Sequence, residues 1–374
     1  MRSKRIVTGM GVALVLLAFA VTARAQGPLF KNTTTGNPKL KSIEAISFGP
    51  KGLLLIGDGR GSQVVAVDTG DTTKKTWTKT EVKKIKDELA NRVGTTGKGI
   101  EILKMAVNPA SQKAYFAVRI MQGKKDLILT MDADGKINEF DLENVKHVRV
   151  ALPADTKVAT ITDITWAGDR VLVAAQANET FGSKIFVISG PLDNESKCAC
   201  VSAETFHVAH NRWETKAPIR TVLPYEEKGK KFLVGAFTCT PVVKYSIDDL
   251  QSGAKVKGMS VIELGSGNTP LGMFTYEKGG KKYILMNTKR FMKAFGPSPY
   301  WTVRIDYDLL QENTKVNEKA LLRLKGNNES ATDRAQMMTD YHGVMTMARL
   351  DDERALGVRT DGKGGFDLVV LALP

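Results

Sequence analysis

The chain has 374 residues, with 54 Lys or Arg against 40 Asp or Glu, so its formal charge is +14. This length allows an ordinary hydrophobic core, and three cysteines are too few for a small fold held together by disulfides. The basic residues are scattered in lysine pairs beside glycines, without a basic helix or an RNA-binding aromatic motif. This pattern argues against nucleic-acid binding and favours an acidic partner.

Residues 1–25 have the composition of a secretory signal peptide. Three basic residues precede an apolar run at 12–21, and a small-residue cleavage site ends at Ala25. The run is too short for a permanent anchor, and no later segment is apolar enough to span a bilayer. We therefore predict a periplasmic or secreted protein with a charge of about +10, in which 26–40 form an N-terminal extension.

A pattern of three strands recurs along the remaining 41–374. Each copy has an apolar strand, a polar turn, a second apolar strand, a loop and a strand of alternating character. The copies begin roughly 50–70 residues apart, near the period of a propeller blade. They cover 43–68, 102–140, 161–189, 218–247, 270–306 and 341–373. The sequence thus predicts an all-β fold with a single domain, a six-bladed β-propeller, because a closed ring protects the strand edges.

Two segments depart from this pattern. Apolar residues at helical spacing, from Val82 to Val93, predict a short helical insertion at 81–93 between blades. The weakly patterned segment 309–339 is either an elaborated loop or a degenerate blade, so seven blades are the alternative. The last strand, 368–373, is expected to pair into the blade begun near the N-terminus and so close the ring.

Histidines and cysteines, which are scarce in this chain, gather in one region. His207 and His210 lie just after Cys198 and Cys200, and imidazole with thiolate suits copper, zinc or iron. The predicted ligands of a copper or zinc site are His207, His210, Cys239 and His342. The spacing matches neither HExxH nor paired CxxC motifs. The alternative is a disulfide from Cys239 to Cys198 or Cys200, with the histidines as ordinary hydrogen-bonding residues.

Several short motifs support a resemblance. They are His210 with 214–220 (ETKAPIR), Cys239-Thr-Pro241, Glu263-Leu-Gly265 with Asn268-Thr-Pro-Leu271, and Gly57-Asp58 with Ala66-Val-Asp68. Together they resemble the central signature of an uncharacterised family of exported bacterial β-propeller proteins. The resemblance implies the propeller fold and export, and it implies no reaction. The residues to which it draws attention are His210, Glu214, Arg220, Cys239 and Asn268.

Propeller geometry predicts which loops meet at the channel. Loops that precede the inner strands and loops that follow the second strands share one face of the ring. On this face we expect the principal site, formed by the loop 207–220 with Cys239, Asn268 and His342. The candidate ligand-binding residues are Glu214, Arg220, Asn268, Arg119 and Asp163.

The chain has no nucleophile elbow, Walker loop, dinucleotide fingerprint or haem-attachment motif. We therefore predict an exported binding protein that uses one channel face, with its His/Cys loop, for a small ligand, a metal or a partner protein. The alternative is a metal-dependent periplasmic enzyme, either an oxidoreductase or a lactonase-type hydrolase.

Overall fold

The computed structural model describes residues 28–208, 211–239, 241–265, 267–291, 298–312, 314–316, 322–325, 329–330 and 334–374. The predicted signal peptide at 1–25 and the predicted ligand His210 lie outside these residues. Within the described ranges, no helix is both long and apolar enough to cross a membrane.

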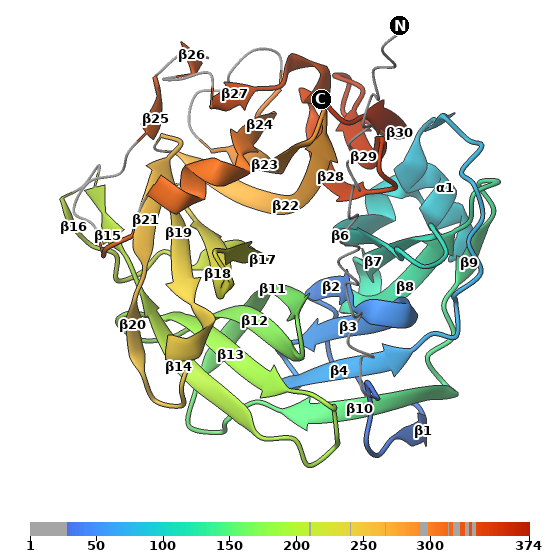
Figure 1. Cartoon of the computed structure of the whole chain (residues 1–374). Coiled ribbons are helices and arrows are strands. Elements are labelled where there is room, and N and C mark those ends of the chain that lie inside the picture. Colours follow the sequence, from blue (N-terminus) through green and yellow to red (C-terminus); the bar gives the residue numbers. More distant parts are fainter. Residues whose placement is uncertain are drawn as a thin grey trace, which may run out of the picture.

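Six sheets stand around a central channel as the blades of a β-propeller (Figure 1). Blade 1 contains, from the channel outward, β2 (Ala45–Phe48), β3 (Leu53–Asp58), β4 (Gln63–Asp68), β10 (Val145–Ala151) and β1 (Thr34–Gly36). Blade 2 contains β6 (Ile100–Val107), β7 (Ala114–Ile120), β8 (Lys125–Met131) and β9 (Ile137–Glu139). Blade 3 contains β11 (Val158–Ala167), β12 (Arg170–Ala177), β13 (Ser183–Ser189), β14 (Cys198–Glu204) and β20 (Lys255–Lys257).

The other three blades follow the same plan. Blade 4 contains β17 (Ile219–Glu227), β18 (Lys230–Phe237), β19 (Pro241–Ser246), β21 (Met259–Glu263), β25 (Leu322–Lys325) and β26 (Glu329–Ser330). Blade 5 contains β22 (Asn268–Lys278), β23 (Lys281–Arg290), β24 (Tyr300–Asp306) and β27 (Ala335–Met337). Blade 6 contains β28 (Val344–Arg349), β29 (Arg354–Thr360), β30 (Phe366–Ala372) and β5 (Glu81–Val82). The prediction of six blades is confirmed.

The weakly patterned segment does not form a seventh blade. Its described parts are the turn η6 (Tyr307–Glu312) and the short strands β25, β26 and β27. These strands extend the outer edges of blades 4 and 5.

Blades 1 and 2 exchange places relative to the order of the chain. The inner strand β2 packs between β11 and β6, and β6 also packs against β28 (Figure 1). The order around the ring is therefore 1, 3, 4, 5, 6, 2. After β4 the chain adds β5 to blade 6, builds blade 2 and returns to blade 1 as β10.

The ring closes differently from the expectation for the last strand. β30 stays within blade 6, and its outer partner is β5, where Leu368 faces Val82. A segment from the first quarter of the chain thus completes the last blade. The expectation that β30 joins the blade begun near the N-terminus is corrected. The chain runs from β4 of blade 1 to β5, and β5 pairs with β30 at the outer edge of blade 6.

The predicted helical insertion contains α1 (Ile85–Arg92). Ile85 and Leu89 are fully buried in the apolar cluster that blades 2 and 6 share. Val82 belongs to β5, so the helix begins later than the apolar periodicity suggests. The insertion therefore contains a strand for blade 6 and a helix that covers the junction between blades 2 and 6.

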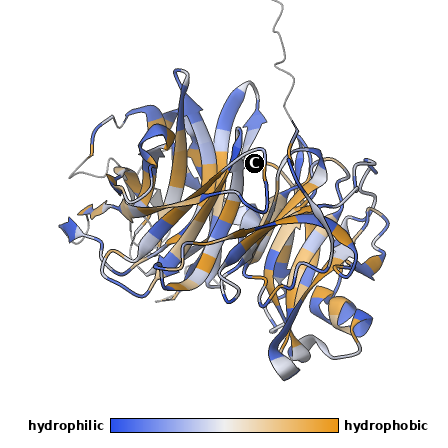
Figure 2. Ribbon diagram, turned by 90° about the horizontal axis from the view of Figure 1, so that it is seen from below, coloured by the Kyte–Doolittle hydropathy of each residue, from blue (hydrophilic) through white to orange (hydrophobic). Residues whose placement is uncertain are grey.

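The continuous apolar runs of the second strands follow from burial on both faces. In β3, Leu53 and Leu55 pack into the cluster shared with blade 3, whereas Leu54 and Ile56 pack into the cluster shared with blade 2. Alternate residues of a strand face opposite sides, so each blade seals two interfaces. Burial of each such side chain contributes about 1.5–3 kcal/mol. Figure 2 shows the apolar residues within the strands and the polar residues mainly in the loops.

Candidate binding sites in the central channel

A charged crossbar spans the channel. Lys104 of β6 places its Nζ 3.0 Å from Oδ1 of Asp163 in β11, and it donates a hydrogen bond of 3.2 Å to the carbonyl of Leu271 in β22. Oδ2 of Asp163 accepts hydrogen bonds from the Thr221 hydroxyl (2.7 Å) and the Val222 amide (3.0 Å) in β17. Side chains and backbone from blades 2, 3, 4 and 5 therefore meet here.

The crossbar separates two cavities. One has a volume of about 270 Å³ and is called here the narrow cavity; the other, the wide cavity, has about 530 Å³. Lys104 lines both of them. The narrow cavity lies toward the N-terminal ends of the inner strands, which is the face where the sequence predicted the site.

A repeated irregularity shapes the narrow cavity. The inner strands β6, β11, β17, β22 and β28 each carry a register shift near their N-terminal ends. In four of them the unpaired residue lines the narrow cavity, namely Leu103, Thr162, Arg220 and Leu271. A β-bulge redirects a side chain and twists the strand locally. These bulges turn four side chains from the blade interfaces toward the channel.

Two predicted ligand-binding residues, Arg119 and Arg220, line the narrow cavity, and a third, Asp163, is part of the crossbar beside it. Arg119 forms a two-pronged pair with Asp126, with Nε–Oδ1 at 2.7 Å and Nη2–Oδ2 at 2.9 Å. Burial disfavours the charge of Asp126, but hydrogen bonds from Arg119 and the Ile43 amide outweigh it and lower the pKa of Asp126. Arg119 is therefore already neutralised by the protein.

Arg220 is in a different position. None of its side-chain atoms forms a hydrogen bond or ion pair with the described residues, and its Nε is buried without a partner among them. Burial lowers the pKa of Arg220, and the nearby Asp163 carboxylate offsets this only in part. Asp163 is itself held by Lys104.

Glu44 is the acidic residue that lines the narrow cavity. Its Oε2 accepts hydrogen bonds from the Ile161 amide (2.7 Å) and the Thr160 hydroxyl (3.2 Å), and its Oε1 accepts one from Ser42 Oγ (3.2 Å). Glu44 thereby links blade 1 to blade 3. It makes no ion pair with Arg220.

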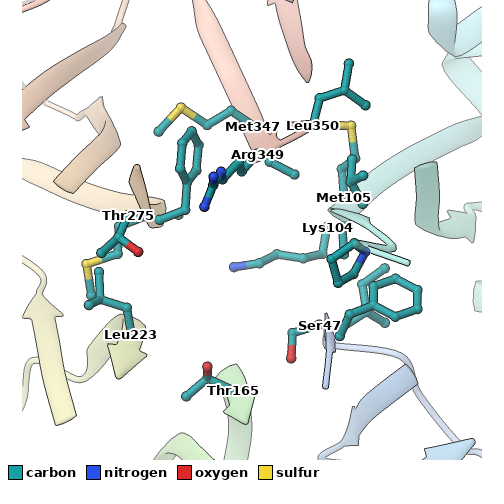
Figure 3. Close-up of a pocket in the computed structure, with 18 of the residues that line it drawn as sticks. Ser47, Lys104, Met105, Thr165, Leu223, Thr275, Met347, Arg349 and Leu350 are labelled. Carbon is teal, nitrogen blue, oxygen red and sulfur yellow. The ribbon is translucent and has the colours of Figure 1, made fainter. Parts of the chain in front are cut away.

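The wide cavity opens at the other mouth, between all six inner strands (Figure 3). Lys104 extends into its centre, and hydroxyls of Ser47, Thr165 and Thr275 lie along its wall. Apolar side chains supply much of the remaining lining, including Phe48, Met105, Leu223, Phe274 and Met347. The rim carries Arg349, which pairs with Asp352. This mixture of apolar surface and a few convergent polar groups is typical of small-molecule sites.

The loop 207–220 is only partly at the channel. His207 is buried in β15 (Phe206–His207), which pairs with β16 (Arg212–Trp213) at the outer side of blades 3 and 4 (Figure 1). Glu214 accepts hydrogen bonds from the backbone amides of Lys216 (2.8 Å) and Ala217 (2.9 Å). Burial opposes the charge of Glu214, but these bonds dominate and lower its pKa. Glu214 thus braces the loop through the backbone, and Arg220 is not its partner.

Asn268 and Cys239 do lie together. The Cys239 amide donates a 2.8 Å hydrogen bond to the Asn268 carbonyl, and the Asn268 side chain accepts one of 2.8 Å from Trp301 Nε1. Asn268 is fully buried and does not line either cavity. His342 is half-buried at the start of blade 6, after η7 (Thr339–Tyr341).

The described residues contain no group of three or more His, Cys, Asp or Glu side chains placed to hold a metal ion. The predicted ligand His210 is not among them, so the copper or zinc site stays a prediction. Among the described residues no disulfide joins Cys239 to Cys198 or Cys200, which corrects the alternative of a Cys239 disulfide. Cys198 and Cys200 pack against the cluster between blades 1 and 3, whereas Cys239 lies beside Asn268 at blades 4 and 5.

Sequence reasoning missed Lys104 and the wide cavity. A lysine in an apolar strand was available as a signal, because Lys104 interrupts the run from Ile102 to Val107. The bulges had no such signal, since they depend on the pairing register.

No protein-family model matches the chain, and no curated protein matches it. One similar solved structure is the PQQ-bound aldose sugar dehydrogenase of Streptomyces coelicolor, at 14% identity and a TM-score of 0.36, over 91% of this chain and 99% of that chain. Another is a bifunctional GH43-CE protein of Bacteroides eggerthii, at 11% identity and a TM-score of 0.37, over 72% of this chain and 32% of that chain. The β-propeller architecture rests on the strand pairing, and similarity at this level carries no argument about activity or cofactor.

Proposed function

We propose that this protein is an exported binding protein whose channel holds a small organic molecule in the wide cavity. The signal-peptide-like composition of 1–25 supports export. The proposal of binding rests on the wide cavity, which has a volume of about 530 Å³. All six inner strands line it, and the Lys104–Asp163 crossbar closes one end. Its volume falls in the usual range for ligand pockets.

The lining favours a ligand with an apolar body. Met105 and Met347 supply flexible, polarizable surface, and Phe48 and Phe274 supply aromatic surface. A planar or chain-like hydrocarbon can displace water from these side chains. The burial of its apolar area would provide most of the binding free energy.

Lys104 favours a hydrogen-bond acceptor on that ligand. Its ammonium carries three protons, and Asp163 and the Leu271 carbonyl take two of them. The third remains for an acceptor that enters the wide cavity. An aromatic or aliphatic carboxylate combines the apolar body with this acceptor.

The test uses 2-naphthoate, titrated by its fluorescence or by calorimetry. We expect it to bind with a stoichiometry of one, and we expect 2-naphthylmethylamine, which has the same ring and a cation, to bind at least tenfold more weakly. Thr275→Trp should abolish the binding by filling the cavity, and Thr165→Phe is a second blocking variant. Equal binding by the blocked variants, with folding verified by circular dichroism, would refute the proposal.

A further inference from the structure

We infer that the narrow cavity is a second, separate site, which binds an oxyanion through Arg220. This inference does not depend on the proposed function of the wide cavity. The two cavities lie on opposite sides of the crossbar and share Lys104. Each can therefore be altered by substitutions that do not line the other.

The first support is the position of the Arg220 charge. Arg220 is half-buried with its Nε fully buried, and a charge removed from water in this way is costly unless a counter-charge and hydrogen bonds compensate it. The described residues provide no hydrogen bond and no ion pair to this guanidinium. A bound anion would supply the compensation that the protein omits.

The second support is that the other charged residues of the cavity have partners. Lys104 is held by Asp163, Arg119 by Asp126, and the Glu44 carboxylate by the Ile161 amide and two hydroxyls. Among the charged residues that line this cavity, Arg220 is the exception.

The third support is the backbone that carries Arg220. The register of β17 with β18 passes from Ile219–Phe237 to Thr221–Ala236, so Arg220 sits on the bulge. Side chains alternate between the two faces of a strand. Without the extra residue of the bulge, regular alternation would place the Arg220 side chain on a different face. Arg220 therefore has no pairing partner in β18, and its guanidinium faces the channel.

The chemistry indicates the class of ligand. A guanidinium binds carboxylate or phosphate oxygens in a two-pronged geometry, which a point charge such as an ammonium does not reproduce. A volume of about 270 Å³ is suited to a small anion. Thr162 is unavailable because its hydroxyl donates to the Ile219 carbonyl, so recognition depends on Arg220. The ligand is a small oxyanion, either a carboxylate or a phosphate.

Inorganic phosphate and acetate are titrated into the protein in separate runs at constant ionic strength, and calorimetry measures the affinity for each anion. Arg220→Met should lower the affinity for the bound anion at least tenfold, and Arg220→Lys should retain part of it. Arg60→Met is the matched control, since it removes one positive charge from an exposed residue that does not line the cavity and already pairs with Asp126. We expect this control to bind like the wild type.

The anion that binds shows whether the natural ligand carries a phosphate or a carboxylate group. Binding of phosphate alone indicates a phosphorylated or inorganic ligand, and binding of acetate alone indicates a carboxylate. If neither anion binds at 10 mM, or if Arg60→Met and Arg220→Met lose affinity equally, the assignment of Arg220 is overturned. Thr275→Trp should leave this anion binding intact, which separates the inference from the proposed function.

Discussion

The Lys104 ammonium and the Asp163 carboxylate lie 3.0 Å apart although they come from blades 2 and 3, which blade 1 separates in the ring. Their side chains are largely buried, with 15% and 8% of their surface exposed. The pair therefore joins non-adjacent blades through the channel. It also closes the floor of the wide cavity.

The crossbar should stabilise the ring as a unit. We expect Lys104→Met and Asp163→Asn each to lower the free energy of unfolding by about 3 kcal/mol, because each leaves a buried partner unpaired. The double variant should cost less than the two losses added together, by about 1–3 kcal/mol. Urea unfolding of the four proteins measures this coupling. Strict additivity would show that the two groups do not interact in solution.

Asp126 should contribute to the loss of stability in acid. Its folded-state pKa lies below its usual value, so its contribution is complete above the unfolded pKa of about 4 and disappears as the pH falls through the folded value. Asp126→Asn should therefore lose less stability than the wild type between pH 7 and pH 3. Urea unfolding at both pH values tests this. Asp169→Asn is the control with a small expected effect, because Asp169 is 69% exposed.

The Cys198 thiol should be unreactive in the folded protein. Burial raises the pKa of Cys198 to about 12, so the nucleophilic thiolate is scarce at pH 8. We expect iodoacetamide to label Cys198 only as fast as the protein unfolds, measured by peptide mapping. Labelling at the rate of a free thiol, or a disulfide found in the non-reduced map, would contradict the placement of this residue.

Lys244 is a buried cation that serves packing within blade 4. Its Nζ is 2.7 Å from Glu227, 2.8 Å from the Leu310 carbonyl and 4.7 Å from the centre of the Phe232 ring. Lys244→Met should lower the free energy of unfolding by about 3–5 kcal/mol, because Glu227 loses its counter-charge. The exposed pair Lys282–Glu277 provides the control, and Lys282→Met should change stability by no more than about 0.5 kcal/mol. Similar effects of the two substitutions would show that burial of Lys244 is not maintained.

The sequence was sufficient to predict the blades, because their apolar runs and turns follow from burial on two faces. The sequence did not predict the order of the blades around the ring. A copy such as 43–68 has the same hydrophobic pattern whichever blade packs beside it. The apolar period at 81–93 indicated a helix correctly, but it did not reveal that Val82 pairs with Leu368.

The candidate site was predictable in part. Loop position predicted that Arg119, Arg220 and Asp163 lie at one face, where two of them line the narrow cavity, but it did not predict the wide cavity at the other mouth. It did not separate them from Glu214 and Asn268, whose side chains bond to neighbouring backbone and to Trp301. Such local bonds depend on loop conformation, and sequence spacing does not specify it.

Ligand binding in the channel, rather than on an outer surface of the propeller, can be observed directly. The most direct measurement is a crystal structure of the full mature protein grown with 2-naphthoate. We expect density for the rings between the six inner strands, with a carboxylate oxygen within about 3.2 Å of Lys104 Nζ. An empty channel at a saturating concentration, or a probe bound at the β15–β16 hairpin instead, would contradict this expectation.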